Sequence, residues 1–286
     1  MDQKIIDLYD EYMHAPLERR VFIKRLTALT GSTAGAMAAL PLLDSNYALA
    51  VTVAPDDARI EAGYVSYAGA SGPIRAYLGR PNGTAKLPAV VIIHENRGLQ
   101  PYLEDVVRRT AIEGFVALAP DLLSPFGGAP ADEDAARQMF TKIDRATALA
   151  DLVAGVAYLR ARSDVSGKIG HIGFCWGGGM ANNLAVYLPE LVAAVSFYGI
   201  QPAAADVPNI KAKLLLHYAG LDTRINAGIA AYEAALQAAG VSYTKYMYEG
   251  TQHAFHNEAA GARYNKEAAD LAWGRTVEFL NATLKH

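Results

Sequence analysis

The pattern of hydrophobic and polar positions from residue 59 onward consists of short apolar runs separated by longer amphipathic stretches. The first two runs alternate between apolar and polar side chains around a glycine-rich turn, which predicts an opening β-hairpin. The later runs are apolar at successive positions, as is typical of strands that are buried on both faces of a sheet. The expected strands are 59–68 and 73–81 in the hairpin, then 88–94, 115–121, 168–174, 192–199, 212–220 and 242–250.

Helical periodicity fills most of the segments between these runs. One helix is expected to begin at Pro101 and to end at Gly114, because proline favours the first turn and glycine terminates helices. Further helices are expected at about 132–162, from Gly178 onward, at about 226–239 and up to Leu284. Apolar strands that alternate with amphipathic helices predict an α/β fold, in which helices cover both faces of a mainly parallel sheet.

Length and composition indicate one large domain, residues 51–286, after a distinct N-terminal segment, residues 1–50. The 286 residues are 52% hydrophobic, and 26 Lys and Arg against 29 Asp and Glu give a formal net charge of −3. This charge argues against a nucleic-acid partner, which would require a basic excess. The single cysteine excludes an internal disulfide, and no Cys/His cluster has zinc spacing, so neither a metal nor an organic cofactor is expected.

The N-terminal segment has two interpretations. Arg19 and Arg20 precede a mildly apolar run that ends in Ala-Leu-Ala at 48–50, an order typical of a twin-arginine export signal cleaved after Ala50. Such a signal predicts a periplasmic mature protein, in which no apolar run is long enough to span a membrane. The alternative is a helical arm retained in a cytoplasmic protein, packed through Ile6, Leu8, Tyr9, Tyr12 and Met13.

Cys175 lies where an apolar strand gives way to a glycine cluster, within Gly173-Phe174-Cys175-Trp176-Gly177. This is the nucleophile-elbow pattern with cysteine in place of serine. The flanking glycines suit a turn so tight that the strand and the helix approach too closely for a Cβ. A helix N-terminus beneath the sulfur would also favour the thiolate. The alternative is that Cys175 is a small buried core residue.

The elbow predicts its partners in the chain order nucleophile, acid, histidine. Asp222 follows the strand 212–220 and His253 follows the strand 242–250, so both stand just past a strand end. Taken singly, Asp222 could be a helix N-cap and His253 an ordinary loop histidine. His256 is a rival base three residues on, and structural roles are expected for His94, His171 and His217.

Five segments together resemble the dienelactone hydrolases (carboxymethylenebutenolidases), which have the α/β-hydrolase fold. They are HENRG at 94–98, APDLLSPFGG at 119–128, GKIGHIGFCWGG at 167–178, YAGLD at 218–222 and QHAFHN at 252–257. The resemblance covers about residues 59–286. It implies hydrolysis of an ester or lactone, with Cys175 as nucleophile, Asp222 as acid and His253 as base.

The resemblance also gives Glu95 a role as the glutamate that contacts the resting thiol and accepts its proton when substrate binds. A charged glutamate at the end of a buried strand needs a partner, and the thiol is one candidate. The alternative is an ion pair with nearby Arg97. The oxyanion hole is expected to consist of the backbone N–H groups of Trp176 and Asn96.

The chain departs from the family pattern at two positions next to His253. Asn257 stands where the family has an arginine that holds the substrate carboxylate, and Gln252 stands where glycine is usual. A second arginine could correspond to Arg137, although its segment has no reliable register. The sequence therefore predicts an ester or lactone hydrolase acting through a thioester, but leaves the natural substrate and the oligomeric state open. Alternatives are a broad aryl carboxylesterase or thioesterase, and a non-catalytic binding module on the same fold.

Overall fold

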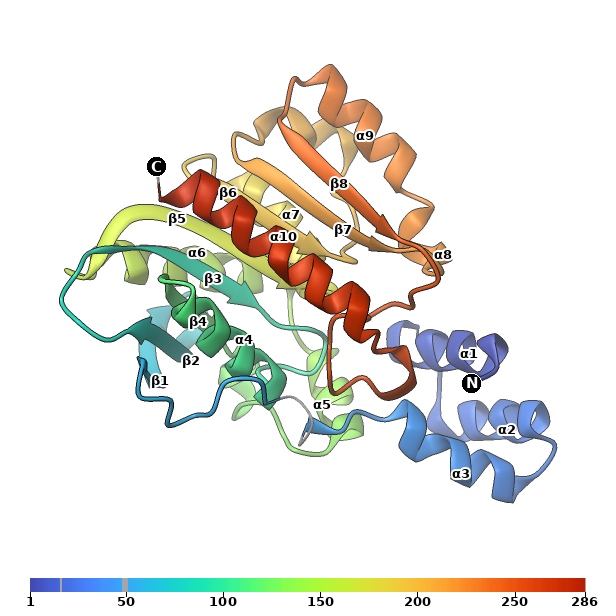
Figure 1. The fold of residues 1–286 in the computed structure, drawn as a ribbon. Coiled ribbons are helices and arrows are strands. Elements are labelled where there is room, and N and C mark those ends of the chain that lie inside the picture. The colour runs from blue at the N-terminus through green and yellow to red at the C-terminus, as the bar shows by residue number, and fades with distance from the viewer. Residues whose placement is uncertain (16, 48–50, 286) are drawn as a thin grey trace.

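The computed structural model describes residues 1–15, 17–47 and 51–285, and is built around an eight-stranded sheet with the order β1-β2-β4-β3-β5-β6-β7-β8 (Figure 1). The strands are β1 (Ile60–Gly69), β2 (Gly72–Pro81), β3 (Leu87–Ile93), β4 (Val116–Pro120), β5 (Val165–Phe174), β6 (Ala193–Phe197), β7 (Lys213–Ala219) and β8 (Tyr243–Tyr248). The pairs β1–β2 and β2–β4 are antiparallel, and the other neighbouring pairs are parallel. The expected opening hairpin and mainly parallel sheet are confirmed.

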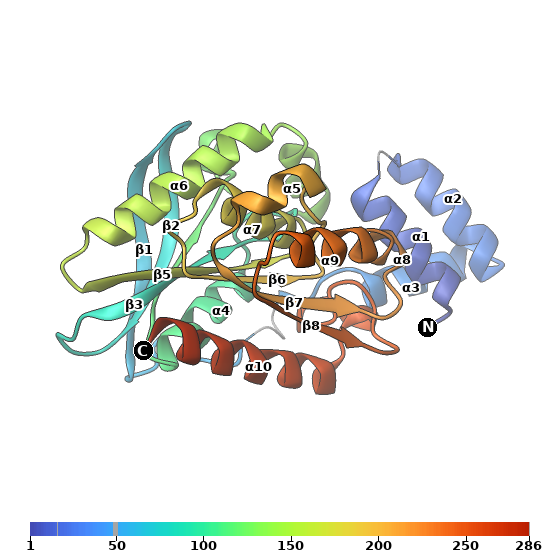
Figure 2. The same cartoon turned by 90° about the horizontal axis from the view of Figure 1, so that it is seen from above.

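Helices cover both faces of the sheet, as Figure 2 shows from above. One face carries α4 (Pro101–Ile112) and α10 (Lys266–Leu284), and the other carries α6 (Arg145–Ala161), α7 (Trp176–Tyr187) and α9 (Ile229–Ala238). Shorter elements are α5 (Glu133–Phe140), α8 (Thr223–Asn226) and the 3₁₀ turns η2 (Ser124–Phe126), η3 (Ala204–Asn209) and η4 (Gly261–Arg263). The arrangement is the expected α/β-hydrolase fold.

The central strand β3 shows why its sequence lacks the alternation of a half-exposed strand. Val90 and Ile92 pack into the core beneath α4 and α10, whereas Val91 and Ile93 pack into the core beneath α6 and α7. All four side chains are fully buried. Since successive side chains of a strand point to opposite faces, a strand covered on both sides must be apolar at every position.

Three helix boundaries differ from the sequence-based expectation. The stretch expected as one helix at 132–162 is two, α5 and α6, because Asp144 accepts a hydrogen bond from the Thr147 N–H and caps a new helix. The helix expected at 226–239 is preceded by α8 and begins at Ile229. The helix after the elbow begins at Trp176 rather than Gly178, since glycine at its first turns does not prevent helix formation there.

The N-terminal segment folds as three helices: α1 (Gln3–His14), α2 (Arg19–Thr30) and α3 (Thr33–Leu43). They share a small apolar core in which Tyr12 stacks on Phe22 with the ring centroids 4.3 Å apart. The residues named in the helical-arm interpretation, Ile6, Leu8, Tyr9, Tyr12 and Met13, are all buried. Both views place α1 beside α8, at the carboxyl ends of the parallel strands (Figures 1 and 2).

Of the two features of an export signal, the structure describes the paired arginines but not the proposed cleavage site. Arg19 and Arg20 are exposed at the start of α2, whereas Ala48, Leu49 and Ala50 lie outside the described residues. Within the described residues, no single helix has the length and apolar character needed to cross a membrane. In the same described part of the chain, α2 and α3 taken together meet those criteria, and they are bent by 110° relative to one another.

Candidate active site

The segment around Cys175 is a sharp turn between β5 and α7. Cys175 has φ 56° and ψ −116°, a backbone conformation that side-chain-bearing residues rarely adopt. A Cβ at Gly173 would overlap the backbone of Gly177, and a Cβ at Gly177 would overlap the backbone of Ile93. Both flanking glycines are therefore required by close approach of the backbone, and the turn directs the sulfur toward the carboxyl edge of the sheet.

His253 and Asp222 form a tightly bonded pair beside this turn. The Nδ1 atom of His253 lies 2.5 Å from an Asp222 carboxylate oxygen, and both residues are buried. The other oxygen of Asp222 accepts a hydrogen bond of 3.1 Å from the Ile225 N–H, so Asp222 also caps α8. Asp222 is therefore a helix N-cap and is at the same time bonded to His253. The second ring nitrogen of His253, Nε2, is buried without a hydrogen-bond partner among the described residues.

The electrostatic surroundings favour a thiolate at Cys175. Burial alone would raise the pKa of the thiol, but the positive charges of His253 and His14 hold that pKa well below its usual value. Burial likewise lowers the pKa of His253, whereas the thiolate and the Asp222 carboxylate raise it well above the usual value. Both shifts favour the thiolate of Cys175 and the imidazolium of His253.

A second histidine, His14 at the end of α1, contacts the sulfur. Its Nε2 atom lies 3.2 Å from Sγ of Cys175, and its ring packs edge-on against His253 with the centroids 4.7 Å apart. Its Nδ1 atom lies 2.9 Å from the Asp10 carbonyl oxygen and 3.1 Å from an Asp10 carboxylate oxygen. The sequence analysis missed this pair, although the spacing of Asp10 and His14 places both on one face of a helix.

The loop after β3 holds α1 against the elbow. Asn96 donates a hydrogen bond of 2.9 Å from its side-chain amide to the Met13 carbonyl oxygen, and Arg97 contacts the Met13 sulfur. Arg97 also donates to the Asn96 side chain and forms a long ion pair of 3.8 Å with Glu133. The interpretation that pairs Arg97 with Glu95 is therefore wrong, because these partners already engage its guanidinium.

Glu95 is held by the residue that replaces the family arginine. Asn257 donates a hydrogen bond of 2.7 Å to one Glu95 carboxylate oxygen, while the other oxygen is buried without a partner among the described residues. Burial and then the Cys175 charge raise the pKa of Glu95 to about 7. Glu95 thus interacts with the sulfur through charge, and Asn257 rather than the sulfur is its hydrogen-bond partner.

Comparisons with known proteins give the same family as the segments around this site. The family model described as "Dienelactone hydrolase family" matches residues 74–284. The chain belongs to the dienelactone hydrolase family. Membership supports hydrolase activity on ester or lactone bonds.

Individual members of the dienelactone hydrolase family match over most of the chain. The "Putative carboxymethylenebutenolidase" of Saccharolobus solfataricus is 33% identical over 248 residues, covering 74% of this chain and 95% of its own. The "Probable 2-oxo-3-(5-oxofuran-2-ylidene)propanoate lactonase" of a Bradyrhizobium species is 33% identical over 219 residues, covering 72% and 88%. A solved structure named as a "Putative Dienelactone Hydrolase" of Klebsiella pneumoniae is 28% identical, with a TM-score of 0.69 over 77% of this chain and 97% of that one.

Apart from His14 and His253, the histidines that the structure describes in this dienelactone hydrolase family member have structural partners. His256 contacts the Tyr102 hydroxyl at 2.5 Å and is packed among aromatic rings, so the rival base is already occupied. The three histidines expected to be structural are buried and hydrogen-bonded: His94 to Glu95 and Leu122, His171 to Ala181, and His217 to Tyr248 and Thr276.

Two neighbouring cavities lie beside His14 and His253, and the smaller of them includes the thiol. The smaller, about 20 Å³, lies directly over Cys175 and is closed by Met13 and His14 of α1. The larger, about 340 Å³, lies between α1 and α8 and shares His14, His253 and Arg263 with the smaller one. A volume of 20 Å³ holds about one water molecule, whereas ligand sites begin near about 300 Å³. Only the larger cavity has room for a small ester.

Arg263 is a second residue that the sequence analysis missed. It lies in η4, is 6% exposed, and its Nε has no hydrogen-bond partner among the described residues. Arg137, by contrast, lies over the Tyr12 ring on the far side of α1, with 4.3 Å between its guanidinium carbon and the ring centroid. Arg263 rather than Arg137 therefore lines the cavities of this family member, and unlike Arg97 it lines both of them.

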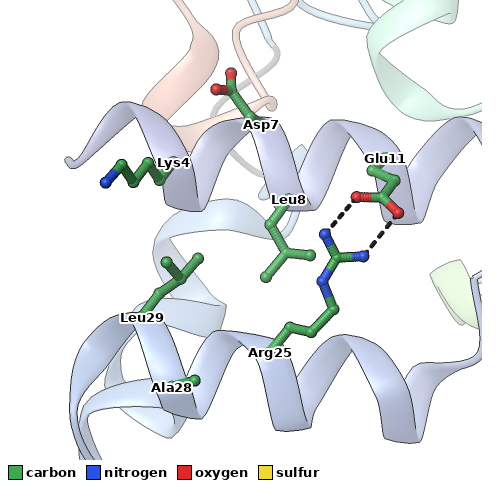
Figure 3. Close-up of a pocket in the computed structure, with 7 residues that line it drawn as sticks. All are labelled: Lys4, Asp7, Leu8, Glu11, Arg25, Ala28 and Leu29. Atoms are coloured by element: carbon green, nitrogen blue, oxygen red, sulfur yellow. Dashed lines mark hydrogen bonds and ion pairs between the residues drawn. The ribbon is translucent and has the colours of Figure 1, made fainter.

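A third hollow lies away from the thiol, in the groove of about 490 Å³ between α1 and α2 (Figure 3). Arg25 crosses this groove and donates hydrogen bonds of 2.7 and 2.8 Å to the Glu11 carboxylate. The groove shares only Asp7 and Glu11 with the 340 Å³ cavity and no residue with the cavity over Cys175, so it is a groove between two helices of the arm rather than the reaction site.

The raised pKa of Glu95 predicts how a variant should alter stability with pH. A carboxyl group with a pKa of 4.5 when unfolded and about 7 when folded stabilises the fold below pH 4.5, and that contribution is lost as pH rises to 7. Glu95→Gln cannot ionise but can still accept the hydrogen bond of Asn257. The Tm of the variant relative to the unmodified protein should therefore rise between pH 5 and 7.5. A constant difference in calorimetric Tm across this range would contradict the shifted pKa.

Proposed function

We propose that this protein hydrolyses a small ester or lactone through Cys175, His253 and Asp222, with a thioester intermediate. The observation that carries the proposal is the strained elbow at Cys175 with the buried Asp222–His253 pair beside it. An inert core cysteine would need neither a positive φ nor an oriented imidazole. A thiolate held at neutral pH is the reactive form of cysteine.

The reaction begins when the thiolate attacks the substrate carbonyl carbon, forming the C–S bond and moving the carbonyl electrons onto oxygen. Trp176 is the first residue of α7, so its N–H has no acceptor within the helix and can donate to this oxyanion. The Asn96 N–H is the second donor in the proposal. His253 then gives its proton to the departing oxygen as the C–O bond breaks, and Asp222 keeps its ring oriented. Water attacks the thioester with His253 as base, releasing the acid and the thiolate.

The cavities support a small anionic substrate. Arg263 lines both the thiol cavity and the 340 Å³ cavity, and a buried guanidinium favours a carboxylate partner. Asn257, at the position of the family arginine, is committed to Glu95. We therefore place the acidic group of the substrate near Arg263. The compound in the name of the Bradyrhizobium relative, 2-oxo-3-(5-oxofuran-2-ylidene)propanoate, contains both a lactone and a carboxylate.

Alkylation of the single thiol tests the proposal against a silent binding module. Iodoacetamide should modify one group per chain, abolish hydrolysis in proportion, and react more slowly when a substrate-like acid is present. Between pH 8.5 and 6 the rate should fall by less than about 10-fold, whereas an ordinary thiol of pKa about 8.5 would lose about 150-fold of its thiolate. An unreactive thiol in folded protein, or full hydrolysis after complete alkylation, would overturn the proposed mechanism.

We also propose that the paired arginines direct export to the periplasm. Supporting residues are Arg19 and Arg20, which are exposed and start a helix that leads into the apolar α3. Replacing both with Lys should leave the full-length chain in the cytoplasm, while the unmodified protein should accumulate in the periplasm starting near Val51. Mature unmodified protein that is cytoplasmic and keeps Met1 or Asp2 would instead favour the retained arm.

A further inference from the structure

The Cys175 sulfur and two imidazole rings, those of His14 and His253, converge at the end of α1. Among the residues that the structure describes, His14, Cys175 and His253 are the one group of three that could hold a metal ion. A nitrogen from each imidazole and the sulfur all lie within 4.8 Å of one another. Cys175 and His253 are 7% and 4% exposed, and Nε2 of His253 is buried without a partner.

Each histidine is oriented by a carboxylate on its far side. Nδ1 of His14 faces Asp10, and Nδ1 of His253 faces Asp222, which leaves both Nε2 atoms for the centre. Histidines that bind metals almost always use their other nitrogen in this way, because the carboxylate fixes the ring and makes the coordinating nitrogen more basic. The two pairs come from segments more than 200 residues apart, so helix geometry alone does not produce this convergence.

We propose that, in the full-length chain, His14, Cys175 and His253 form a binding site for a divalent ion of the zinc class, which fastens α1 over the reaction centre; cleavage after Ala50 would remove His14 and with it this site. Imidazole and thiolate are the donors that zinc prefers, and three protein ligands leave a fourth position for water. Binding replaces protons by the metal: the sulfur coordinates as thiolate, and each imidazolium releases its Nε2 proton to solvent.

The distances fit such an ion after a small closure. Zn–N bonds of about 2.05 Å and Zn–S bonds of about 2.3 Å in a tetrahedral site place neighbouring ligand atoms about 3.4 to 3.6 Å apart. The separation of 3.2 Å between His14 Nε2 and Cys175 Sγ is already close to this value. The widest separation, at most 4.8 Å, needs to shorten by about 1.4 Å or less.

Two consequences follow from the identity of the ligands. Metal bound to the sulfur and to the proposed base removes both from hydrolysis, so bound ion and turnover exclude one another. Because His14 belongs to the arm and the other ligands belong to the sheet domain, the ion also cross-links the two. The arm should then resist proteolysis at its exposed Arg19 and Arg20.

Cadmium titration of the full-length chain, stripped with a chelator, tests the site. One equivalent should produce a thiolate-to-cadmium absorption band, which Cys175→Ser should abolish. His14→Gln should weaken affinity by at least about 100-fold, and Asp10→Asn by about 10- to 100-fold through the orienting contact. Glu11→Gln is the matched control on the same helix, because Glu11 pairs with Arg25 away from the sulfur, and its affinity should be unchanged.

Zinc should also slow tryptic cleavage at Arg19 and Arg20 in the unmodified chain and not in His14→Gln. Equal affinity in His14→Gln and the unmodified chain, or a bound ion without the thiolate band, would overturn the proposal. If circular dichroism shows that His14→Gln does not fold, the cadmium affinity of Asp10→Asn is compared instead, and an affinity equal to that of the unmodified chain would overturn the proposal. Since these measurements need no turnover, failure of the metal site is distinguishable from failure of the proposed hydrolysis.

Discussion

Cys175→Ala should lower kcat/KM for phenyl esters by at least about 10³-fold, because removal of the nucleophile leaves only the oxyanion donors and binding. Cys175→Ser should recover little of this loss. The site stabilises a thiolate through two imidazoles, and a serine hydroxyl would remain protonated beside them. Steady-state hydrolysis of a phenyl ester, normalised to folded protein by circular dichroism, measures both variants.

Two histidines three residues apart provide the control for this prediction. His253→Asn should lose activity about as severely as Cys175→Ala, since His253 is bonded to Asp222 at the thiol. His256→Asn should lose far less per folded molecule, because His256 contacts Tyr102 within the aromatic core. Equal losses in the two histidine variants, or full activity in Cys175→Ser, would contradict the assigned roles.

Phenyl esters should be hydrolysed with a much larger kcat than ethyl esters of the same acid. The tetrahedral intermediate expels either the alcohol or the thiolate, and the group of lower pKa leaves faster. A thiolate of low pKa departs more easily than an alkoxide, whose conjugate acid resembles water at about 15.7, so ethyl esters mostly revert. Phenols, near pKa 10 like tyrosine, and the enols of unsaturated lactones compete far better.

The magnitude should exceed about 100-fold in kcat, because several pKa units separate the two leaving groups. Matched phenyl and ethyl esters of one small acid, each measured at saturation, isolate the leaving group from binding. A difference confined to KM would show uniform binding rather than a transition-state effect. Equal kcat values for the phenyl and ethyl esters would argue against a mechanism in which the alcohol and the Cys175 thiolate compete as leaving groups.

The sequence predicted the sheet well because buried parallel strands leave an unambiguous pattern. β3 is apolar at successive positions since both of its faces are covered, whereas the edge strand β1 has exposed positions between its buried and half-buried ones. Helical periodicity alone does not reveal the break between α5 and α6, which depends on Asp144 as the N-cap of α6. Local capping decides such boundaries more than periodicity does.

At the candidate site, the sequence predicted the residues that follow strand ends but not the residues contributed by the N-terminal arm. Parallel strands deliver Cys175, Asp222 and His253 to one edge of the sheet, so their order along the chain carries spatial information. His14 is 161 positions away from Cys175 in the sequence. It lies on α1, which docks on the sheet domain through the contacts of Asn96 with Met13 and of Arg137 with Tyr12. No periodicity in the chain encodes such a contact. The partner of Glu95 was likewise missed, because Asn257 was judged only as a lost arginine.

The central claim is that Cys175 carries the acyl group of the substrate. Rapid quenching in acid during turnover of a phenyl ester, followed by proteolysis and mass spectrometry, tests it directly. The account predicts that the peptide containing Cys175 gains the mass of the acyl group, in up to one equivalent per chain, and that neutral hydroxylamine removes it as expected of a thioester. Turnover with Cys175 unmodified and the acyl group on another residue, or on none, would contradict the account.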